Sequence, residues 1–168
     1  MDYTTHYFSP LGEMMMASDG EALVGLWFEG QKYFAEGLDK EYVECKDLPI
    51  FQETKAWLDT YFSGRIPEFT PKMKMRASGF RQRVWEVLLR IPYGHTMTYG
   101  AIARSIAQEQ GLASMSAQAI GGAVGHNSIA LIIPCHRVVG TDGSLTGYAG
   151  GIDKKAWLLK MEGVPATS

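Results

Sequence analysis

A change of hydrophobic pattern near residue 72 most strongly constrains how this chain can fold. Before that point, short segments rich in β-forming residues are separated by the turn sequences Pro10-Leu11-Gly12 and Ser18-Asp19-Gly20. One amphipathic helix is predicted at about 50–62, ended by Ser63-Gly64. The first part therefore predicts a small antiparallel sheet with one helix. Its predicted strands are 2–9, 13–17 and 22–28.

After that point the pattern becomes helical. Apolar residues recur at helical spacing in 80–91, and Pro92-Tyr93-Gly94 ends that helix. Thr98 can cap a second helix and Ser114 a third. These three helices are compatible with a helix-turn-helix, although three amphipathic helices are more often only a small core. A short apolar strand is predicted at 131–133, followed by a turn, a second strand and a last helix.

The segment between the two patterns is predicted to be a linker. Residues 65–77 contain two prolines and several basic residues, which places a domain boundary near residue 72. We therefore expect an α+β protein with an N-terminal sheet-plus-helix domain, 1–71, and a mainly helical domain, 72–168, that carries a winged helix-turn-helix.

The composition excludes several classes of protein. No apolar run approaches the ~20 residues that a membrane-spanning helix needs. Two cysteines cannot form a disulfide framework, so we expect an intracellular, cytoplasmic protein in a reducing compartment. Neither Cys45 nor Cys135 has partners at zinc-finger spacing, so we expect no structural metal.

The charge is unevenly distributed along the chain. Residues 1–71 hold five Lys/Arg and thirteen Asp/Glu, a net charge of −8, whereas residues 72–168 hold eleven and five, a net charge of +6. Two charged surfaces could simply pair within the molecule. The alternative is that the second part binds a polyanion such as nucleic acid.

The third predicted helix has an unusual composition. Residues 116–123 carry almost no bulk and no charge, and they include two adjacent glycines, each costing roughly 1 kcal/mol relative to alanine. The usual compensation for missing side chains is the close approach of another backbone. That backbone could belong to another protein element or to a nucleic-acid strand, and the basic charge favours the second.

The densest set of reactive side chains surrounds Cys135. A free cysteine is usually an inert buried residue. Here Pro134 ends the preceding segment, and His136 and Arg137 are groups that can favour a thiolate. Adjacent residues on a strand point to opposite faces, so either the backbone turns at this point or a water connects thiol and imidazole. An imidazole that takes a proton also needs a third group to hold it, for which Glu162 and Asn127 are the candidates.

These residues resemble the O6-alkylguanine–DNA alkyltransferase family, also called methylated-DNA–protein-cysteine methyltransferases. The resemblance covers essentially the whole second half, and the Pro-Cys-His-Arg-Val block together with the other motifs in order is highly specific. The first half is similar only in its pattern of strands and one helix, which implies a ribonuclease H-like support domain. The matching motifs are 80–85, 91–94, 98–100, 121–123, Asn127, 133–139, Tyr148, 150–151, Lys155, 157–159 and 162–163.

The resemblance implies a role for each reactive residue. Cys135 would accept the alkyl group from guanine O6, with O4-alkylthymine left open as a second substrate. His136 would deprotonate the thiol through a water, and Glu162 would orient His136. Asn127 would fix the turn, and Tyr99 would donate a proton to the departing guanine. No cofactor is implied, and each molecule would act once because nothing nearby could cleave the thioether product.

The resemblance also implies how substrate and DNA are held. Family members bind double-stranded DNA through the minor groove and flip the damaged nucleotide out. The expected DNA contacts lie on the third helix, at Ala117, Gln118, Ala119, Gly121 and Gly122. The expected pocket residues are Val138, Tyr148, Ala149 and Lys155. We expect a monomer.

This chain departs from the family pattern at three places. Gln118 stands where relatives commonly place an arginine that fills the gap left by the flipped base. Ala149 stands where some relatives carry a serine. The zinc ligands that some relatives carry in the first domain have no match.

Structural interpretations compete with each of these roles. Tyr99 could pack on the core, Asn127 could only form a turn, and Lys155 could be a solvated helix residue. Glu162 could be an exposed terminal charge. Two other functions remain open, which are a DNA-lesion sensor that transfers nothing and a cysteine hydrolase built on Cys135 and His136. The presence of Cys135 counts against the sensor, and the hydrolase leaves the basic helical half unexplained.

Overall fold

The computed structural model describes residues 1–165, and the chain divides into two compact units. The first unit comprises Met1–Arg76 together with Ser128–Ala130. The second comprises Ala77–Asn127 and the chain from Leu131 onward. Among the described residues, no helix is long and apolar enough to span a membrane.

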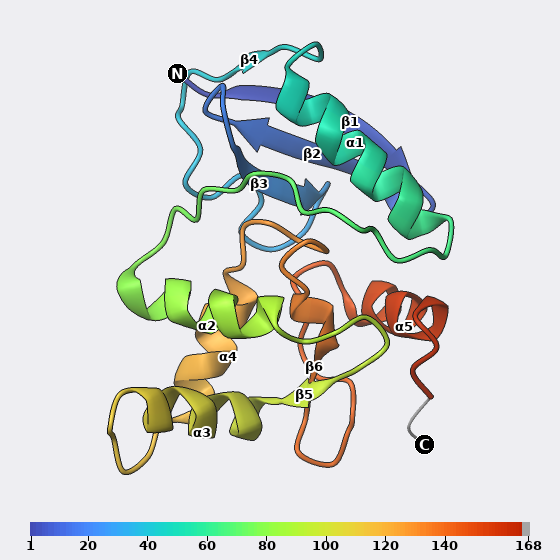
Figure 1. Ribbon diagram of the computed structural model, residues 1–168. Coiled ribbons are helices and arrows are strands. Elements are labelled where there is room, and N and C mark those ends of the chain that lie inside the picture. The colour runs from blue at the N-terminus through green and yellow to red at the C-terminus, as the bar shows by residue number, and fades with distance from the viewer. Residues whose placement is uncertain (166–168) are drawn as a thin grey trace. The chain divides into compact units, whose positions relative to one another are not determined.

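The first unit is built on a four-stranded sheet in the order β3-β2-β1-β4 (Figure 1). The β1–β2 and β2–β3 pairs are antiparallel, and the short β4 runs parallel to β1. The three predicted strands are confirmed to within two residues at either end, whereas β4 was not predicted. The strands are β1 (Tyr3–Ser9), β2 (Gly12–Ser18), β3 (Leu23–Phe28) and β4 (Val43–Glu44).

The two faces of this sheet are covered differently. Helix α1 (Pro49–Phe62) packs on one face, where Tyr7 donates a hydrogen bond to Asp59 at 2.7 Å. On the opposite face, residues of β2 and β3 form a small apolar cluster under the turns near residues 34–38, and a register irregularity lets both Val24 and Trp27 of β3 join it. This cluster contains Met15, Ala17, Val24 and Trp27.

Strand β3 also bonds to two segments outside the sheet. Leu23 exchanges backbone hydrogen bonds with Lys72 and Lys74, which lie in the segment expected to be a linker. The backbone of Leu26 bonds both to Ser128 and to Ala130, at 2.8 and 2.9 Å. A short piece from much later in the chain therefore completes the first unit.

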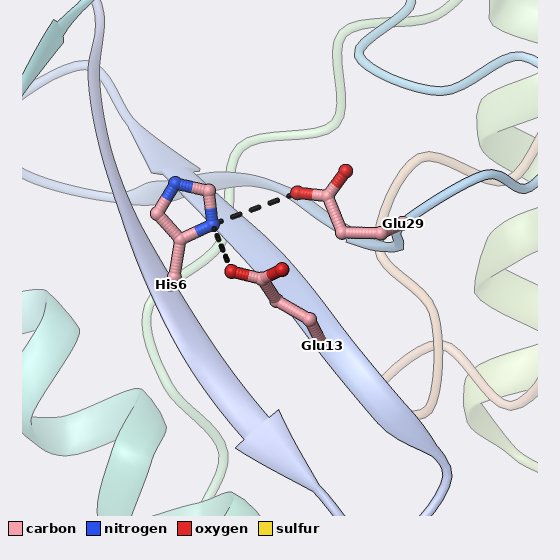
Figure 2. A group of neighbouring side chains, drawn as sticks. All are labelled: His6, Glu13 and Glu29. Atoms are coloured by element: carbon pink, nitrogen blue, oxygen red, sulfur yellow. Dashed lines mark ion pairs between the residues drawn. The ribbon is translucent and has the colours of Figure 1, made fainter.

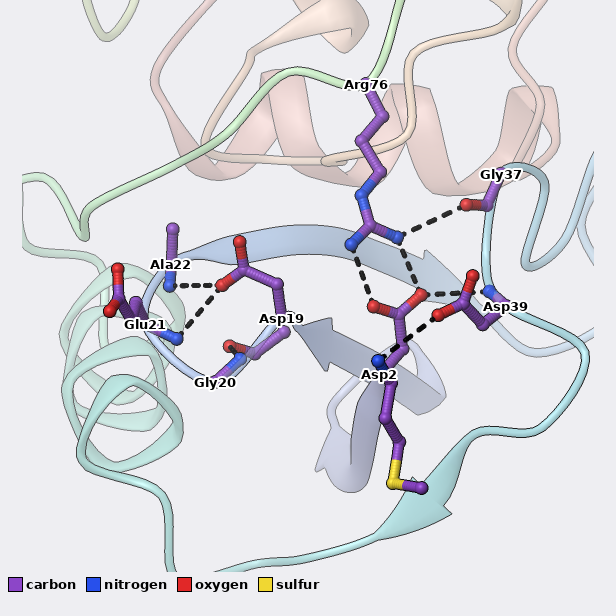
Figure 3. A network of polar contacts seen from close by, with 10 residues as sticks. Asp2, Asp19, Gly20, Glu21, Ala22, Gly37, Asp39 and Arg76 are labelled. Atoms are coloured by element: carbon purple, nitrogen blue, oxygen red, sulfur yellow. Dashed lines mark hydrogen bonds and ion pairs between the residues drawn. The ribbon is translucent and has the colours of Figure 1, made fainter.

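A partly buried ion pair joins the two ends of the 1–76 segment (Figure 3). The guanidinium of Arg76 donates to both carboxylate oxygens of Asp2, at 2.6 and 2.8 Å, and to the carbonyl of Gly37. The backbone N–H of Asp39 bonds to the same carboxylate. The Arg76 hydrogen bonds hold the pKa of Asp2 below its ordinary value despite its burial.

The second unit contains the four remaining α-helices. Side-chain oxygens of Ser78, Thr98 and Ser116 cap the first three by accepting a backbone hydrogen bond. The predicted cap at Ser114 is wrong, because the preceding loop extends to Ser116 before the helix begins. The helices are α2 (Gly79–Leu89), α3 (Tyr99–Glu109), α4 (Ala117–Gly125) and α5 (Ile152–Met161).

The predicted strand at 131–133 is also wrong. These residues form turns, Leu131 adopts a left-handed conformation with φ of 69°, and a 3-10 turn η1 (Cys135–Arg137) follows. The segment is buried on all sides, so its apolar residues show no alternation that distinguishes a strand from a turn. The strand that does form, β6 (Val138–Val139), pairs in parallel with β5 (Met97–Thr98).

Candidate active site

The backbone turns sharply at Cys135, which is the first of the two arrangements that the sequence left open. The N–H of Cys135 bonds to the carbonyl of Ile133 at 2.8 Å, and the Nδ2 group of Asn127 donates to the same carbonyl at 2.8 Å. Asn127 is buried and therefore braces the turn from the end of α4. This places Cys135 at a bend held by hydrogen bonds rather than inside a ladder.

The thiol of Cys135 is nearly enclosed, with 6% of the residue exposed. Burial raises the pKa of Cys135, because a thiolate loses its hydration there. A hydrogen bond with the Asn127 side chain and the charge of Lys155 act in the opposite direction. The thiol is therefore protonated at neutral pH and needs a proton acceptor before it can attack, and Asn127 and Lys155 offset only part of the cost of forming the thiolate.

Arg137 does not lie where the sequence suggested. We expected its charge to favour the thiolate, but its Nη1 group donates to the carbonyl of Ile91 at 2.8 Å and its Nε group to Glu162 at 2.8 Å. A second bond from Nη2 to Glu162 spans 3.2 Å, so the guanidinium clamps the carboxylate. The guanidinium also lies 5.7 Å from the centre of the Tyr93 ring. Arg137 therefore acts on Glu162 rather than on the sulfur.

Glu162 is the centre of a buried polar network. It caps the C-terminus of α5, and its carboxylate accepts bonds from His136 Nε2 at 2.7 Å and from the N–H of Gly94 at 3.0 Å, in addition to Arg137. These donors hold the pKa of Glu162 far below its ordinary value, although burial alone would raise it. The carboxylate is therefore ionised, and the interpretation of Glu162 as an exposed terminal charge does not hold.

This network fixes which nitrogen of His136 can take a proton. Burial lowers the pKa of His136, so the ring is neutral at neutral pH. Since an ionised carboxylate can only accept, Nε2 must carry the hydrogen in its bond to Glu162. The lone pair of the neutral ring then resides on Nδ1, which is the atom able to receive a proton from Cys135.

Lys155 is buried beside the same turn rather than solvated. Its ammonium donates to the carbonyls of Thr146 and Gly147, at 2.8 and 3.2 Å. Burial lowers the pKa of Lys155 to about 8, and the nearby Cys135 opposes that shift. Lys155 therefore anchors the loop before Tyr148 and also brings a positive charge near the sulfur.

Two tyrosines interact electrostatically with Cys135. Tyr99, at the start of α3, donates a hydrogen bond to Thr146 at 3.3 Å, and burial raises its pKa. The hydroxyl of Tyr148 is buried without a hydrogen-bond partner, and burial raises its pKa well above the ordinary value. The Cys135 thiolate disfavours ionisation of both phenols, which places both hydroxyls within electrostatic range of the sulfur. Both phenols remain protonated and can donate hydrogen bonds.

The other two expected pocket residues are Val138, which follows the turn at Cys135, and Ala149, which follows Tyr148. Val138 is fully buried at the start of β6 and Ala149 is half-buried after Tyr148. Within residues 1–165, the grouped side chains that could hold a metal ion lie on the sheet of the first unit, so Cys135 belongs to no such group.

Helix α4 presents the small residues expected to face DNA. Ala117, Gln118, Ala119 and Gly122 are exposed and Gly121 is half-buried. A β-carbon added at Gly121 would lie 4.0 Å from the Tyr99 ring, and one added at Gly122 would meet nothing within 4 Å. Apart from the helix itself, no described atom lies within 4 Å of that added β-carbon, so the outer face of α4 is open at Gly122.

Sequence reasoning missed two parts of this site. It gave Arg137 to the thiol instead of to Glu162, and it gave no role to the backbone N–H of Gly94. A guanidinium next to a candidate imidazole, with a carboxylate needed as the third group, could have suggested the clamp. A backbone donor carries no side-chain signature and could not have been found.

Comparisons with known proteins cover both units. Residues 3–74 match the family described as 6-O-methylguanine DNA methyltransferase, ribonuclease-like domain, and residues 79–164 match the corresponding DNA binding domain. The methylated-DNA–protein-cysteine methyltransferase of Haemophilus influenzae is 37% identical over 164 residues, covering 97% of this chain and 87% of that protein. The protein of the same name from Methanosarcina acetivorans is 40% identical over 161 residues, covering 96% and 98%. The crystal structure of Mycobacterium tuberculosis OGT in complex with DNA matches with a TM-score of 0.83 and 38% identity, covering 98% and 96%.

Proposed function

The chain belongs to the 6-O-methylguanine DNA methyltransferase family, and we propose that it repairs DNA by moving the alkyl group of an O6-alkylguanine onto Cys135. One observation supports this most directly. His136 is bonded through Nε2 to an ionised, clamped Glu162, which leaves Nδ1 as the proton acceptor next to a cysteine at a braced turn.

The proposed reaction is a direct displacement at the alkyl carbon. The proton of Cys135 passes to His136 through a water, and the thiolate attacks the carbon as the carbon–O6 bond breaks. The electron pair of that bond stays on the guanine, which takes a proton from Tyr99. The products are a thioether on Cys135 and an unmodified guanine; His136 releases the proton of Cys135 to solvent, and the Tyr99 phenol regains a proton from solvent.

Each molecule would act only once. A thioether is not cleaved by an imidazole–carboxylate pair, and the second cysteine, Cys45, lies in the other unit. We propose no cofactor for the reaction, and we expect the protein to act in the reducing cytoplasm, where Cys135 stays a thiol.

The target base must leave the duplex to reach Cys135. A base inside the stack hides O6 from a nucleophile fixed on a turn, so the nucleotide would be flipped at a cost of a few kcal/mol, least for a weakly paired lesion. The exposed face of α4 supports close contact with the minor groove, because Gly122 leaves its backbone open. Gln118 would then occupy the gap in the stack by hydrogen bonding to the orphaned base.

A duplex carrying a labelled methyl group on one guanine O6 tests the proposal. We expect at most one label per protein molecule, located on Cys135. The Cys135→Ala variant should bind the duplex but take no label, while the matched control Cys45→Ala should be labelled like the parent protein. Binding without label by the parent protein would indicate a lesion sensor, and repeated release of a small product would indicate a hydrolase.

A further inference from the structure

Three potential metal ligands converge on the sheet face opposite α1 (Figure 2). His6 lies on β1 and Glu13 on β2, where the strand register makes them diagonal neighbours on one face. Glu29 follows β3, and its N–H bonds to the carbonyl of Glu13 at 2.9 Å, which sets the two glutamates side by side. Strands β1 and β2 and the residue after β3 therefore each contribute one side chain.

The imidazole of His6 lies at the spacing of metal ligands from both carboxylates, and the three ligand atoms all lie within 4.8 Å of one another. His6 Nδ1 lies 3.4 Å from an oxygen of Glu13 and 3.5 Å from an oxygen of Glu29. A charge-assisted N–H···O bond is shorter, about 2.7–2.9 Å. Two ligand atoms about 2.1 Å from a tetrahedral ion are about 3.4 Å apart. His6 Nδ1 thus lies at the spacing of two metal ligands from both the Glu13 and the Glu29 carboxylate.

The charges of the group also favour a cation. Like charges directly opposite each other on neighbouring strands are destabilising. Within residues 1–165, His6 is the side chain that forms an ion pair with either Glu13 or Glu29, so one imidazole faces two carboxylates. The three side chains remain 35–41% exposed, which leaves an entry path and room for water ligands.

We propose that His6, Glu13 and Glu29 bind one divalent transition-metal ion of the Zn²⁺ class, through Nδ1 and one oxygen from each carboxylate. The imidazole selects for Zn²⁺ over Mg²⁺ and Ca²⁺, which prefer oxygen ligands alone. Because the three ligands come from β1, β2 and the end of β3, the bound ion stabilises the folded sheet without entering the reaction at Cys135. The expectation of no metal rested on ligand spacing along the chain, whereas this group is assembled by strand register.

Isothermal titration with ZnCl₂ tests the site in a full-length Cys45→Ser/Cys135→Ser protein, where no thiolate competes for the ion. We expect one ion per chain, and His6→Gln and Glu29→Gln should each weaken binding at least about tenfold. The matched controls His95→Gln and Glu53→Gln change exposed residues outside the group and should bind like the parent protein. MgCl₂ should give no comparable binding.

The thermal midpoint of unfolding, measured with and without Zn²⁺, gives a second test of the site. Zn²⁺ should raise the thermal midpoint of the Cys45→Ser/Cys135→Ser protein and of both controls made in it, but not that of the His6→Gln variant. Without metal, the midpoint of the His6→Gln variant should equal that of the Cys45→Ser/Cys135→Ser protein. Unchanged Zn²⁺ affinity in both His6→Gln and Glu29→Gln would overturn the proposal, and so would a titration that never saturates, which would mean an adventitious ion only. Either result leaves the alkyl transfer to Cys135 untouched, because that activity is measured separately.

Discussion

Arg137→Met should destabilise the protein strongly, because it leaves a buried carboxylate without its cation. The side chains of Arg137 and Glu162 are 11% and 0% exposed, and the guanidinium donates two hydrogen bonds to that carboxylate, beside those from His136 and Gly94. Removing one partner of a buried pair typically costs about 3–5 kcal/mol. For a chain of this length that loss corresponds to a fall in the thermal midpoint of about 6–20 °C.

A double-mutant cycle measured by urea unfolding separates the pair from the packing around it. The Arg137→Met/Glu162→Gln protein should be more stable than the two single losses predict, with a coupling of about 0.5–3 kcal/mol. The control Arg90→Met breaks the exposed ion pair with Glu109, where the side chains are 63% and 44% exposed, and should cost about 1 kcal/mol or less. If Arg137→Met costs no more than Arg90→Met, the clamp does not stabilise the fold.

The contribution of Glu162 should depend on pH in a defined direction. Its pKa is lower in the folded protein than in the unfolded chain, so its stabilisation is fully present above the unfolded value. That stabilisation is lost as the pH falls toward the folded pKa. Urea unfolding at decreasing pH should therefore show a loss of stability that Glu162→Gln lacks, and identical pH dependences would refute this assignment.

Three further substitutions test the site and the DNA-facing helix. Lys155→Met should slow the labelling of Cys135 at neutral pH, because the pKa of Cys135 rises without the nearby positive charge. The labelling rate should recover in alkaline buffer. A labelling rate that depends on pH as in the parent protein would exclude this effect. Gln118→Arg should tighten binding to duplex DNA and steepen the slope of log K against log salt by about 0.9, so equal slopes would count against an added phosphate contact. Gly122→Leu should keep the free energy of unfolding within about 1 kcal/mol, since nothing lies near that position, but should weaken DNA binding in a fluorescence anisotropy titration. Unchanged affinity would mean that DNA does not approach this backbone.

Local features of the sequence predicted most of the fold. Strand alternation and turn residues located β1, β2 and β3 to within two residues, and Thr98 caps α3 as expected. The choice between Ser114 and Ser116 could not be made, because both serines can cap and the length of the preceding loop decides between them. The apolar run 131–133 misled for a related reason, since complete burial removes the alternation on which strand prediction depends.

The contacts that could not be predicted from the sequence are those between side chains far apart along the chain. Cys135 and His136 were found because they are adjacent, and Glu162 was one of two candidates for the third group. Only the folded chain brings Arg137 onto a carboxylate 25 residues away and assigns Nε2 of His136 to the same group. Likewise, the proximity of His6 to Glu29 depends on strand register, which a list of residues does not contain.

The way β3 is bonded limits how this chain can be divided. Both backbone groups of Leu26 bond to residues 128–130, which are synthesised only after α2, α3 and α4. A fragment that stops at Arg76 would lose both bonds and leave the edge of β3 unpaired at Leu26, which invites pairing with another chain. The sheet unit is therefore finished only after the ribosome has passed residue 130, and a single protease cut after Arg76 would leave β3 joined to that segment by noncovalent contacts alone.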